Sequence, residues 1–215
     1  MFNLPTLVTI TAPTCAGKNF LLESMVNSGF GRIVSTTDRE ARDGEVEGVH
    51  YFFISTAQSM LKEEKGLFAE LVTYNGTRYG VTHEEMQLKL AAWSPPIVIL
   101  EPNGVEIYRK YCGQHGFTMF SIYVEAQESI RLARLTERTA NEIIMYARRT
   151  GGTPQGVHSI IGANNQRLKS IIENERSWNN TNRWDVIADG TNIEKALEQI
   201  AQGIKFRNSR SEIYK

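Results

Sequence analysis

The chain has 215 residues, of which 41% are hydrophobic, a composition typical of a globular protein with one sizeable core. Twenty-four basic residues balance twenty-four acidic ones, so the net charge favours neither a nucleic-acid partner nor a membrane surface, although a local cluster of Lys and Arg could still bind a small anion. Two cysteines are too few for a disulfide framework, and the first residues do not have the pattern of a signal peptide. The longest aliphatic run (97–100) is too short to span a bilayer. We therefore expect a cytoplasmic protein.

Short apolar runs alternate with helical patterns along most of the chain. Because strands that alternate with helices are typical of βαβ units, the pattern predicts an α/β fold with a parallel sheet. The strands are expected at residues 7–10, 32–35, 97–100, 117–124 and 186–188, and the helices at residues 20–25, 83–93, 105–112, 127–138, 166–178 and 193–204.

Two segments interrupt this alternation. Residues 36–81 combine two apolar runs with a helical pattern and a turn at Asn75-Gly76, which together predict a small α+β insert containing antiparallel strands. Residues 139–165 are rich in Gly, Asn, Thr and Arg, which indicates a mobile flap or, alternatively, a plain surface loop. The predicted organisation is a core (1–35, 82–138 and 166–204), an insert (36–81), a lid (139–165) and a frayed polar tail (205–215).

A candidate phosphate-binding loop follows the first predicted strand and precedes the first predicted helix. Residues 11–19 read TAPTCAGKN, in which Gly17 would allow a tight turn and Lys18 would place an ammonium group on phosphate oxygens. The sequence departs twice from the pattern G-x-x-x-x-G-K-[ST], because Ala12 replaces the first Gly and Asn19 replaces the hydroxyl residue that binds Mg²⁺. The carbonyl oxygen of Asn19 could serve instead. The segment alone could also be a turn before a surface lysine.

The insert carries a second set of polar residues. Arg39 and Arg42, together with the hydroxyls of Tyr51 and Tyr79, form a basic set suited to one phosphate group. Glu70 lies among apolar residues, where an unpaired carboxylate would be unfavourable. The alternative interpretation is an ordinary β-hairpin whose arginines and glutamate face solvent.

Two stretches of the insert carry a family resemblance: residues 35–51, which read STTDREARDGEVEGVHY, and the segment from Phe68-Ala69-Glu70 to Tyr79-Gly80. They resemble the guanylate kinase family, and the resemblance is densest at residues 35–80. It extends more loosely from residue 7 to about residue 200. It implies a three-layer P-loop NTPase fold with a central parallel sheet, a small α+β insert that binds the nucleoside monophosphate, and a helical or loop lid. It also implies transfer of the γ-phosphate of ATP to GMP or dGMP, with Mg²⁺ as cofactor.

The same resemblance implies roles for individual residues. Guanine presents two adjacent donors that suit the carboxylate of Glu70, whereas adenine would leave Glu70 unpaired. The family usually has Ser or Thr where this chain has Val81, and Thr82 is a possible substitute. The implied ATP-binding residues are Ala12, Pro13, Thr14, Cys15, Ala16, Gly17, Lys18, Asn19 and Phe20, and the implied GMP-binding residues are Ser35, Arg39, Arg42, Tyr51, Glu70, Tyr79, Thr82, Glu101 and Asn103.

Arginines near the lid are the remaining candidates. Arg134 and Arg138 are four residues apart, on one face of a predicted helix. Arg149 and Arg167 compete for one role, because the lid is about fifteen residues longer than the family's usual lid; a solvated basic face is the alternative. The implied catalytic residues are Lys18, Arg39, Arg134, Arg138, Arg149 and Arg167.

Two other functions remain open at this level. The changes at Val81 and at Asn103, where the family usually has Asp, favour a monophosphate kinase of altered or broader base preference. The changes at Ala12 and Asn19 favour a catalytically inactive, guanylate-kinase-like binding module. The expected partners are ATP and GMP or dGMP, without nucleic acid or membrane, in a monomer or a homodimer.

Overall fold

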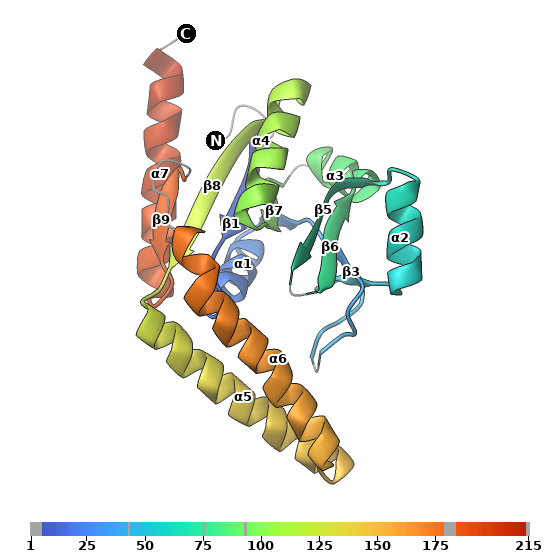
Figure 1. The fold of residues 1–215 in the computed structure, drawn as a ribbon. Helices are drawn as coiled ribbons and strands as arrows, with labels where there is room; N and C mark the ends of the chain where they lie inside the picture. Colours follow the sequence, from blue (N-terminus) through green and yellow to red (C-terminus); the bar gives the residue numbers. More distant parts are fainter. Residues whose placement is uncertain (1–5, 43, 75, 93, 179–183, 214–215) are drawn as a thin grey trace.

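The computed structural model describes residues 6–42, 44–74, 76–92, 94–178 and 184–213. Asn75 of the predicted turn, Trp93 of the predicted helix 83–93, the first five residues and the last two residues of the tail lie outside the described part. The described helices and strands form a mixed α/β fold built on two sheets (Figure 1).

The central sheet is parallel, as the sequence predicts. Its order is β2-β7-β1-β8-β9, and every neighbouring pair runs in the same direction. The paired residues include Val8 with Ile97 and with Phe120, which places the apolar runs of three strands side by side. The strands are β1 (Thr6–Thr11), β2 (Gly31–Arg32), β7 (Pro96–Ile99), β8 (Thr118–Glu125) and β9 (Val186–Asp189).

Helices cover both faces of this sheet, giving three layers. Alternate residues of β1 point to opposite faces, so Val8 packs with α1 and α7, whereas Leu7 packs with α3 and α4. Both strand faces are therefore buried, which explains the wholly apolar run at residues 97–100. The helices are α1 (Lys18–Asn27), α3 (His83–Leu90), α4 (Pro102–His115) and α7 (Ile193–Ile213), which continues through much of the predicted frayed tail.

The second sheet lies beside the core and is formed by the strands of the predicted insert. Its order is β4-β3-β6-β5, with antiparallel pairing of β5 to β6 and of β6 to β3, and parallel pairing of β3 to β4. Its elements are β3 (Thr36–Thr37), β4 (Phe52–Phe53), β5 (Phe68–Tyr74), β6 (Thr77–Thr82) and α2 (Thr56–Glu64). Ser55 begins α2 with a capping box in which its side chain and that of Gln58 each accept a backbone N–H.

The lid region is helical, one of the two forms that the family resemblance implies, and not the flap or surface loop that its composition indicates. Two long helices, α5 (Glu128–Thr150) and α6 (Pro154–Glu173), pack against each other and extend away from the core (Figure 1). Gly151 and Gly152 adopt left-handed conformations, and the Thr153 side chain caps α6 before Pro154. The Gly-Gly-Thr-Pro sequence therefore marks a tight turn between two helices, and mutual packing overrides the low helix propensity of the Asn and Gly residues around it.

None of the helices in the described ranges is long and apolar enough to cross a membrane.

Candidate functional site

A cleft of about 1590 Å³ lies between the core, the second sheet and the lid helices. Most of the residues singled out in the sequence line it. Pro13, Ala16, Thr82 and Asn103 are the exceptions. The lining residues from the predicted set are Ala12, Thr14, Cys15, Gly17, Lys18, Asn19, Phe20, Ser35, Arg39, Arg42, Tyr51, Glu70, Tyr79, Glu101, Arg134, Arg138, Arg149 and Arg167.

The loop between β1 and α1 has a backbone conformation that is uncommon for residues other than glycine. Cys15 has φ 62° and Gly17 has φ 103°, both in the left-handed region, and the Ala16 N–H donates to the Pro13 carbonyl at 3.2 Å. α1 begins at Lys18, so its N-terminus points into the cleft, where it favours an anion. The loop therefore has the features of a phosphate-binding site.

Lys18 is half-buried at the start of α1. Burial lowers the pKa of Lys18, while the negative charges of Glu175 and Glu101 act in the opposite direction. An anion bound beside the ammonium group would further favour its charged form.

A second loop, between β9 and α7, packs directly against the first. A Cβ atom on Gly190 would lie 2.0 Å from the carbonyl oxygen of Ala16, so only glycine allows this approach. Arg134 of α5 joins the two loops, because its Nη1 atom donates to the carbonyls of Cys15 at 3.1 Å and of Gly190 at 3.0 Å. The guanidinium that the sequence assigns to catalysis is thus held at the rim of the phosphate-binding loop.

The sequence analysis missed the loop at Asp189, Gly190 and Thr191, which also lines the cleft. A signal for it exists, since an Asp-Gly pair directly follows the last predicted strand. Loops at the carboxyl ends of parallel strands commonly bind ligands.

In the insert, Arg39 already has an anionic partner, Glu45. Its two terminal nitrogens donate to Glu45 at 2.6 and 2.7 Å, and its guanidinium lies over the ring of Tyr51, 4.9 Å from the centroid. Burial lowers the pKa of Arg39, but the hydrogen bonds to and negative charges of Glu45 and Tyr79 together outweigh burial and raise the pKa above its ordinary value. Glu45, which the sequence analysis did not select, therefore orients Arg39 in this arrangement.

Arg42 lies instead among other cations. Desolvation in the cleft, followed by the positive charges of Arg39, Arg138 and Arg167, lowers the pKa of Arg42 to about 10. Repulsion of this kind is relieved when an anion binds between the groups. The cleft thus combines one paired arginine, Arg39, with a cluster formed by Arg42 of the insert, Arg138 of α5 and Arg167 of α6.

Glu142 of α5 connects two of the lid arginines. It accepts from Arg138 at 2.9 Å and lies 3.5 Å from Arg167 of α6, which also donates to Asn164 at 2.5 Å. Arg149 lies near the end of α5 and lines the same cleft. Both competing lid arginines therefore border the cleft, and Arg167 is the one beside Arg138.

Glu70 of β5 is a buried carboxyl group that lines the cleft, with 6% of its surface exposed. Its Oε1 atom lies against Gly104 of α4, where an added Cβ would be 3.1 Å away. Burial, followed by the charge of Glu101, raises the pKa of Glu70 to about 7. Burial also raises the pKa of Glu101 to about 7, against the opposing effect of Lys18.

Thr82 and Asn103 lie outside the cleft lining. The Thr82 hydroxyl accepts the backbone N–H of Glu85 at 3.3 Å and so begins α3, and Asn103 is exposed on α4. Val81, next to Thr82, is fully buried in the core. Neither polar side chain is therefore placed to contact a ligand in this arrangement.

Glu175 is the third feature that the sequence analysis missed, after the loop at Asp189 and after Glu45. It follows α6, is 2% exposed, and receives hydrogen bonds from Thr14 of the phosphate-binding loop and from Tyr74 of β5. No local sequence pattern distinguishes it from other glutamates, because its partners come from distant parts of the chain.

The sequence comparisons with known proteins indicate one family. The sequence model of the family "Guanylate kinase" matches residues 5–206. The chain is similar to a guanylate kinase of Chlamydia muridarum (strain MoPn / Nigg), with 33% identity over 134 residues, or 61% of this chain and 63% of that one. It is also similar to a guanylate kinase of Prochlorococcus marinus (strain MIT 9313), with 30% identity over 106 residues, or 48% of this chain and 56% of that one. The match thus spans less than two thirds of the length of either relative.

A crystal structure of guanylate kinase from Anaplasma phagocytophilum has a similar fold. Its TM-score is 0.58 at 17% identity, and the alignment covers 95% of this chain and 86% of that one. This likeness supports the P-loop NTPase fold implied by the sequence.

Proposed function

Because the chain belongs to the guanylate kinase family, we propose that it transfers the γ-phosphate of ATP to GMP or dGMP, giving ADP and GDP or dGDP. One observation carries the proposal: a buried carboxyl group, Glu70, the ammonium group of Lys18 and a cluster of arginines all line one cleft. The carboxylate suits the paired donors of guanine, and the ammonium suits the phosphates of ATP.

Phosphoryl transfer depends on positioning and charge neutralisation more than on a covalent protein group. In the proposed mechanism, Lys18 and the backbone N–H groups of its loop hold the β- and γ-phosphates. Arg39 and Arg42, with Tyr51 and Tyr79, hold the acceptor phosphate, and Arg42 also lies beside Arg138 and Arg167 of the lid helices. No general base is needed, because the attacking phosphate oxygen is already an anion.

The lid arginines complete the proposed site. Arg138 and Arg167 lie beside Arg42, so a phosphoryl group between them would meet positive charge from the insert and from both lid helices. Movement of α5 and α6 toward the insert would exclude water and limit hydrolysis of ATP.

Mg²⁺ fits the residues at this site. The ion is usually held by substrate phosphates together with one or two protein oxygens, and Asn19 and Glu101 both line the cleft near Lys18. Bound with ATP, Mg²⁺ would supply charge neutralisation at the β- and γ-phosphates. Asn19 and Glu101 are the side chains that we propose to hold it, directly or through water.

The proposal is tested with a panel of nucleoside and deoxynucleoside monophosphates in an assay of ADP release, with and without Mg²⁺. Turnover of GMP or dGMP well above the other acceptors is expected. Lys18→Ala should lower kcat by at least about a hundredfold while the melting temperature changes little, because the ammonium acts on phosphates. A folded wild-type protein that is inactive with ATP, Mg²⁺ and every acceptor would instead favour the binding module.

A second candidate, a kinase of altered or broader base preference, rests on a specific observation. Val81 is buried and the Thr82 hydroxyl caps α3, so Glu70 has fewer polar neighbours with which to read the base. In the same panel, turnover of dTMP or dCMP that rivals turnover of dGMP would favour this candidate over the guanine-specific one.

A further inference from the structure

Glu175, a carboxylate beside the cleft, accepts five hydrogen bonds from the part of the chain that the structure describes. Its side chain is 1% exposed, and its partners come from the phosphate-binding loop, from the insert and from both lid helices. The donors are the Thr14 N–H at 2.9 Å, the Thr14 hydroxyl at 2.6 Å, the Tyr74 hydroxyl at 2.9 Å, Arg131 Nη1 at 3.0 Å and the Ser170 hydroxyl at 3.3 Å.

The hydrogen-bond partners of Glu175 belong to different structural elements around the cleft. Thr14 lies in the phosphate-binding loop, and Tyr74 is the last residue of β5 in the insert. Ser170 lies in the last turn of α6, and Arg131 lies near the start of α5. Both residues therefore lie at the ends of the two lid helices that adjoin the core. Glu175 is therefore the point at which the donor loop, the acceptor insert and the lid meet.

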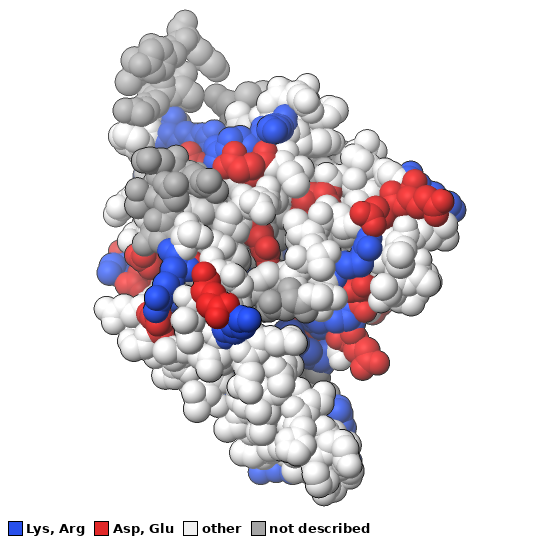
Figure 2. All heavy atoms as spheres, in the orientation of Figure 1, with Lys and Arg blue, Asp and Glu red and all other residues white. Residues whose placement is uncertain are grey.

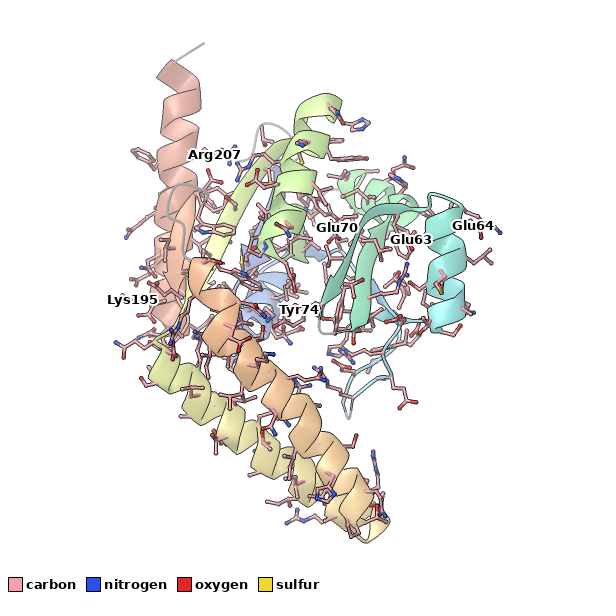
Figure 3. All side chains as sticks on the ribbon, in the orientation of Figure 1. Glu63, Glu64, Glu70, Tyr74, Lys195 and Arg207 are labelled. Atoms are coloured by element: carbon pink, nitrogen blue, oxygen red, sulfur yellow. The ribbon has the colours of Figure 1, made fainter. Side chains whose placement is uncertain are left out.

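The link to the insert leads directly to the proposed base-reading residue. Alternate residues of a strand share a face, so Glu70, Val72 and Tyr74 lie on one side of β5, and all three line the cleft. Figure 3 shows Glu70 and Tyr74 on the side of β5 nearest α4 and α6. A shift of the Tyr74 hydroxyl would therefore move the strand that carries Glu70 relative to the phosphate-binding loop.

The interactions of this group suit positioning more than stability. Arg131 and Glu175 form a buried ion pair, yet the Nε atom of Arg131 is buried without a hydrogen-bond partner among the described residues. Buried ion pairs of this kind contribute little net stability but can select one arrangement of the chain. Burial raises the pKa of Tyr74 to about 12, so its hydroxyl stays protonated and can donate to Glu175 near neutral pH.

We propose that Glu175 is a positioning residue that couples the donor and acceptor sides of the cleft, with Tyr74 and Ser170 as its links to the insert and to the lid. This inference rests on the proposed function, since it concerns the binding of two nucleotides in one cleft. Binding of one nucleotide then orders the Glu175 group and favours binding of the second. In-line transfer is sensitive to misplacement of about 1 Å, so the same group affects kcat.

The first test is Tyr74→Phe, which removes one hydroxyl and leaves the Arg131–Glu175 pair intact. GMP binding is measured by calorimetry with and without a non-hydrolysable ATP analogue. We expect each nucleotide alone to bind within about twofold of wild type, while the coupling between them and kcat both fall about tenfold. Tyr111→Phe is the matched control, because Tyr111 packs against His115 with ring centroids 4.3 Å apart, outside the cleft lining, and should change neither quantity.

The second test follows the link to the lid. Tyr74 and Ser170 also contact each other, with 2.6 Å between their oxygens, so Ser170→Ala and Tyr74→Phe should be non-additive in a double-mutant cycle on kcat. Glu175→Gln should lower kcat more than either, and Glu175→Asp should recover part of the loss. Additive effects of Tyr74→Phe and Ser170→Ala would overturn the proposal.

Two further outcomes would also contradict it. If Tyr74→Phe leaves both coupling and kcat at the wild-type level, Glu175 does not position the two sides. If Tyr74→Phe weakens each nucleotide separately and lowers the melting temperature without changing the coupling, Glu175 is only structural. A wild-type protein that couples ATP-analogue and GMP binding but transfers no phosphate would refute the proposed function and leave this inference intact.

Discussion

The two carboxyl groups Glu70 and Glu101 illustrate how single residues in this cleft are held in unfavourable surroundings. The pKa of each is raised to about 7, against an ordinary value of 4.5, mainly because burial disfavours the charged form. A carboxyl group with a raised pKa in the folded state binds its proton more tightly than in the unfolded chain. The contribution of these two groups to the free energy of unfolding therefore decreases as the pH rises from about 4.5 to about 7 and is lowest above that range.

Glu70→Gln should reverse this loss of stability. At pH 8 the variant should be more stable than wild type by an amount on the order of 1–3 kcal/mol, because no buried charge remains at this position. Near pH 4.5 the two proteins should be nearly equal. Chemical denaturation at both pH values measures the difference, and Glu64→Gln is the control, since Glu64 is exposed on α2 (Figure 3).

The same substitution should impair acceptor binding. Gln offers one acceptor to the two donors of guanine, so KM for GMP should rise about 10- to 100-fold. In wild type, KM for GMP should also rise as the pH falls below about 7, because the proton on Glu70 competes with guanine. The variant should lack that part of the pH profile. An unchanged profile, or an unchanged stability at pH 8, would show that Glu70 is not a buried base-reading carboxylate.

At the scale of elements, the site depends on how closely two loops approach. The loop before α1 and the loop after β9 meet at Ala16 and Gly190, and Arg134 of α5 bonds to both. These loops follow strands β1 and β9, which flank β8 in the parallel sheet. The sheet thus sets the position of each loop, and the absence of a side chain at Gly190 sets the distance between them.

Gly190→Ala should disturb the donor side selectively. Its Cβ would lie 2.0 Å from a backbone oxygen, so the phosphate-binding loop must move. We expect KM for ATP to rise at least about tenfold, since backbone N–H groups position the phosphates, while GMP binding alone changes much less. Isothermal titration with each nucleotide separates the two effects.

Gly113→Ala is the matched control for that substitution. Gly113 is an exposed residue of α4 with no atoms within 4 Å of an added Cβ, and alanine favours a helix more than glycine does. The control should be slightly more stable and fully active. Normal ATP binding by Gly190→Ala would contradict the close approach of the two loops.

At the scale of the whole molecule, the fold class follows from the sequence more completely than the site does. The apolar runs at 97–100 and 117–124 predict β7 and β8 within one residue at each end, because strands buried on both faces need continuous apolar residues. The P-loop NTPase fold is confirmed. The helical lid is not predictable from its composition, because α5 and α6 are stabilised by packing against each other and the Asn and Gly residues weaken the local signal.

Some of the site residues could likewise be predicted from the sequence, and others could not. Arg42, Glu70 and Lys18 were selected because their neighbours in the sequence form patterns, and all three line the cleft. Glu45 and Glu175 were not selected, because a glutamate gains its role from partners that the fold brings to it. The functional roles of both groups stay predictions until nucleotides are bound.

The charges of the molecule are balanced overall, and this determines how salt should act. Lys and Arg lie among Asp and Glu on the face shown in Figure 2, and the formal net charge is zero. The excess positive charge is local, at Arg42, Arg138 and Arg167 beside the cleft.

Raising the salt concentration from about 50 to 500 mM should therefore raise KM for GMP several-fold, because ions screen the cluster, while the melting temperature changes little. Guanosine, which lacks the phosphate, should bind with an affinity that hardly depends on salt, and a salt-independent KM for GMP would show that the arginine cluster does not attract the acceptor phosphate.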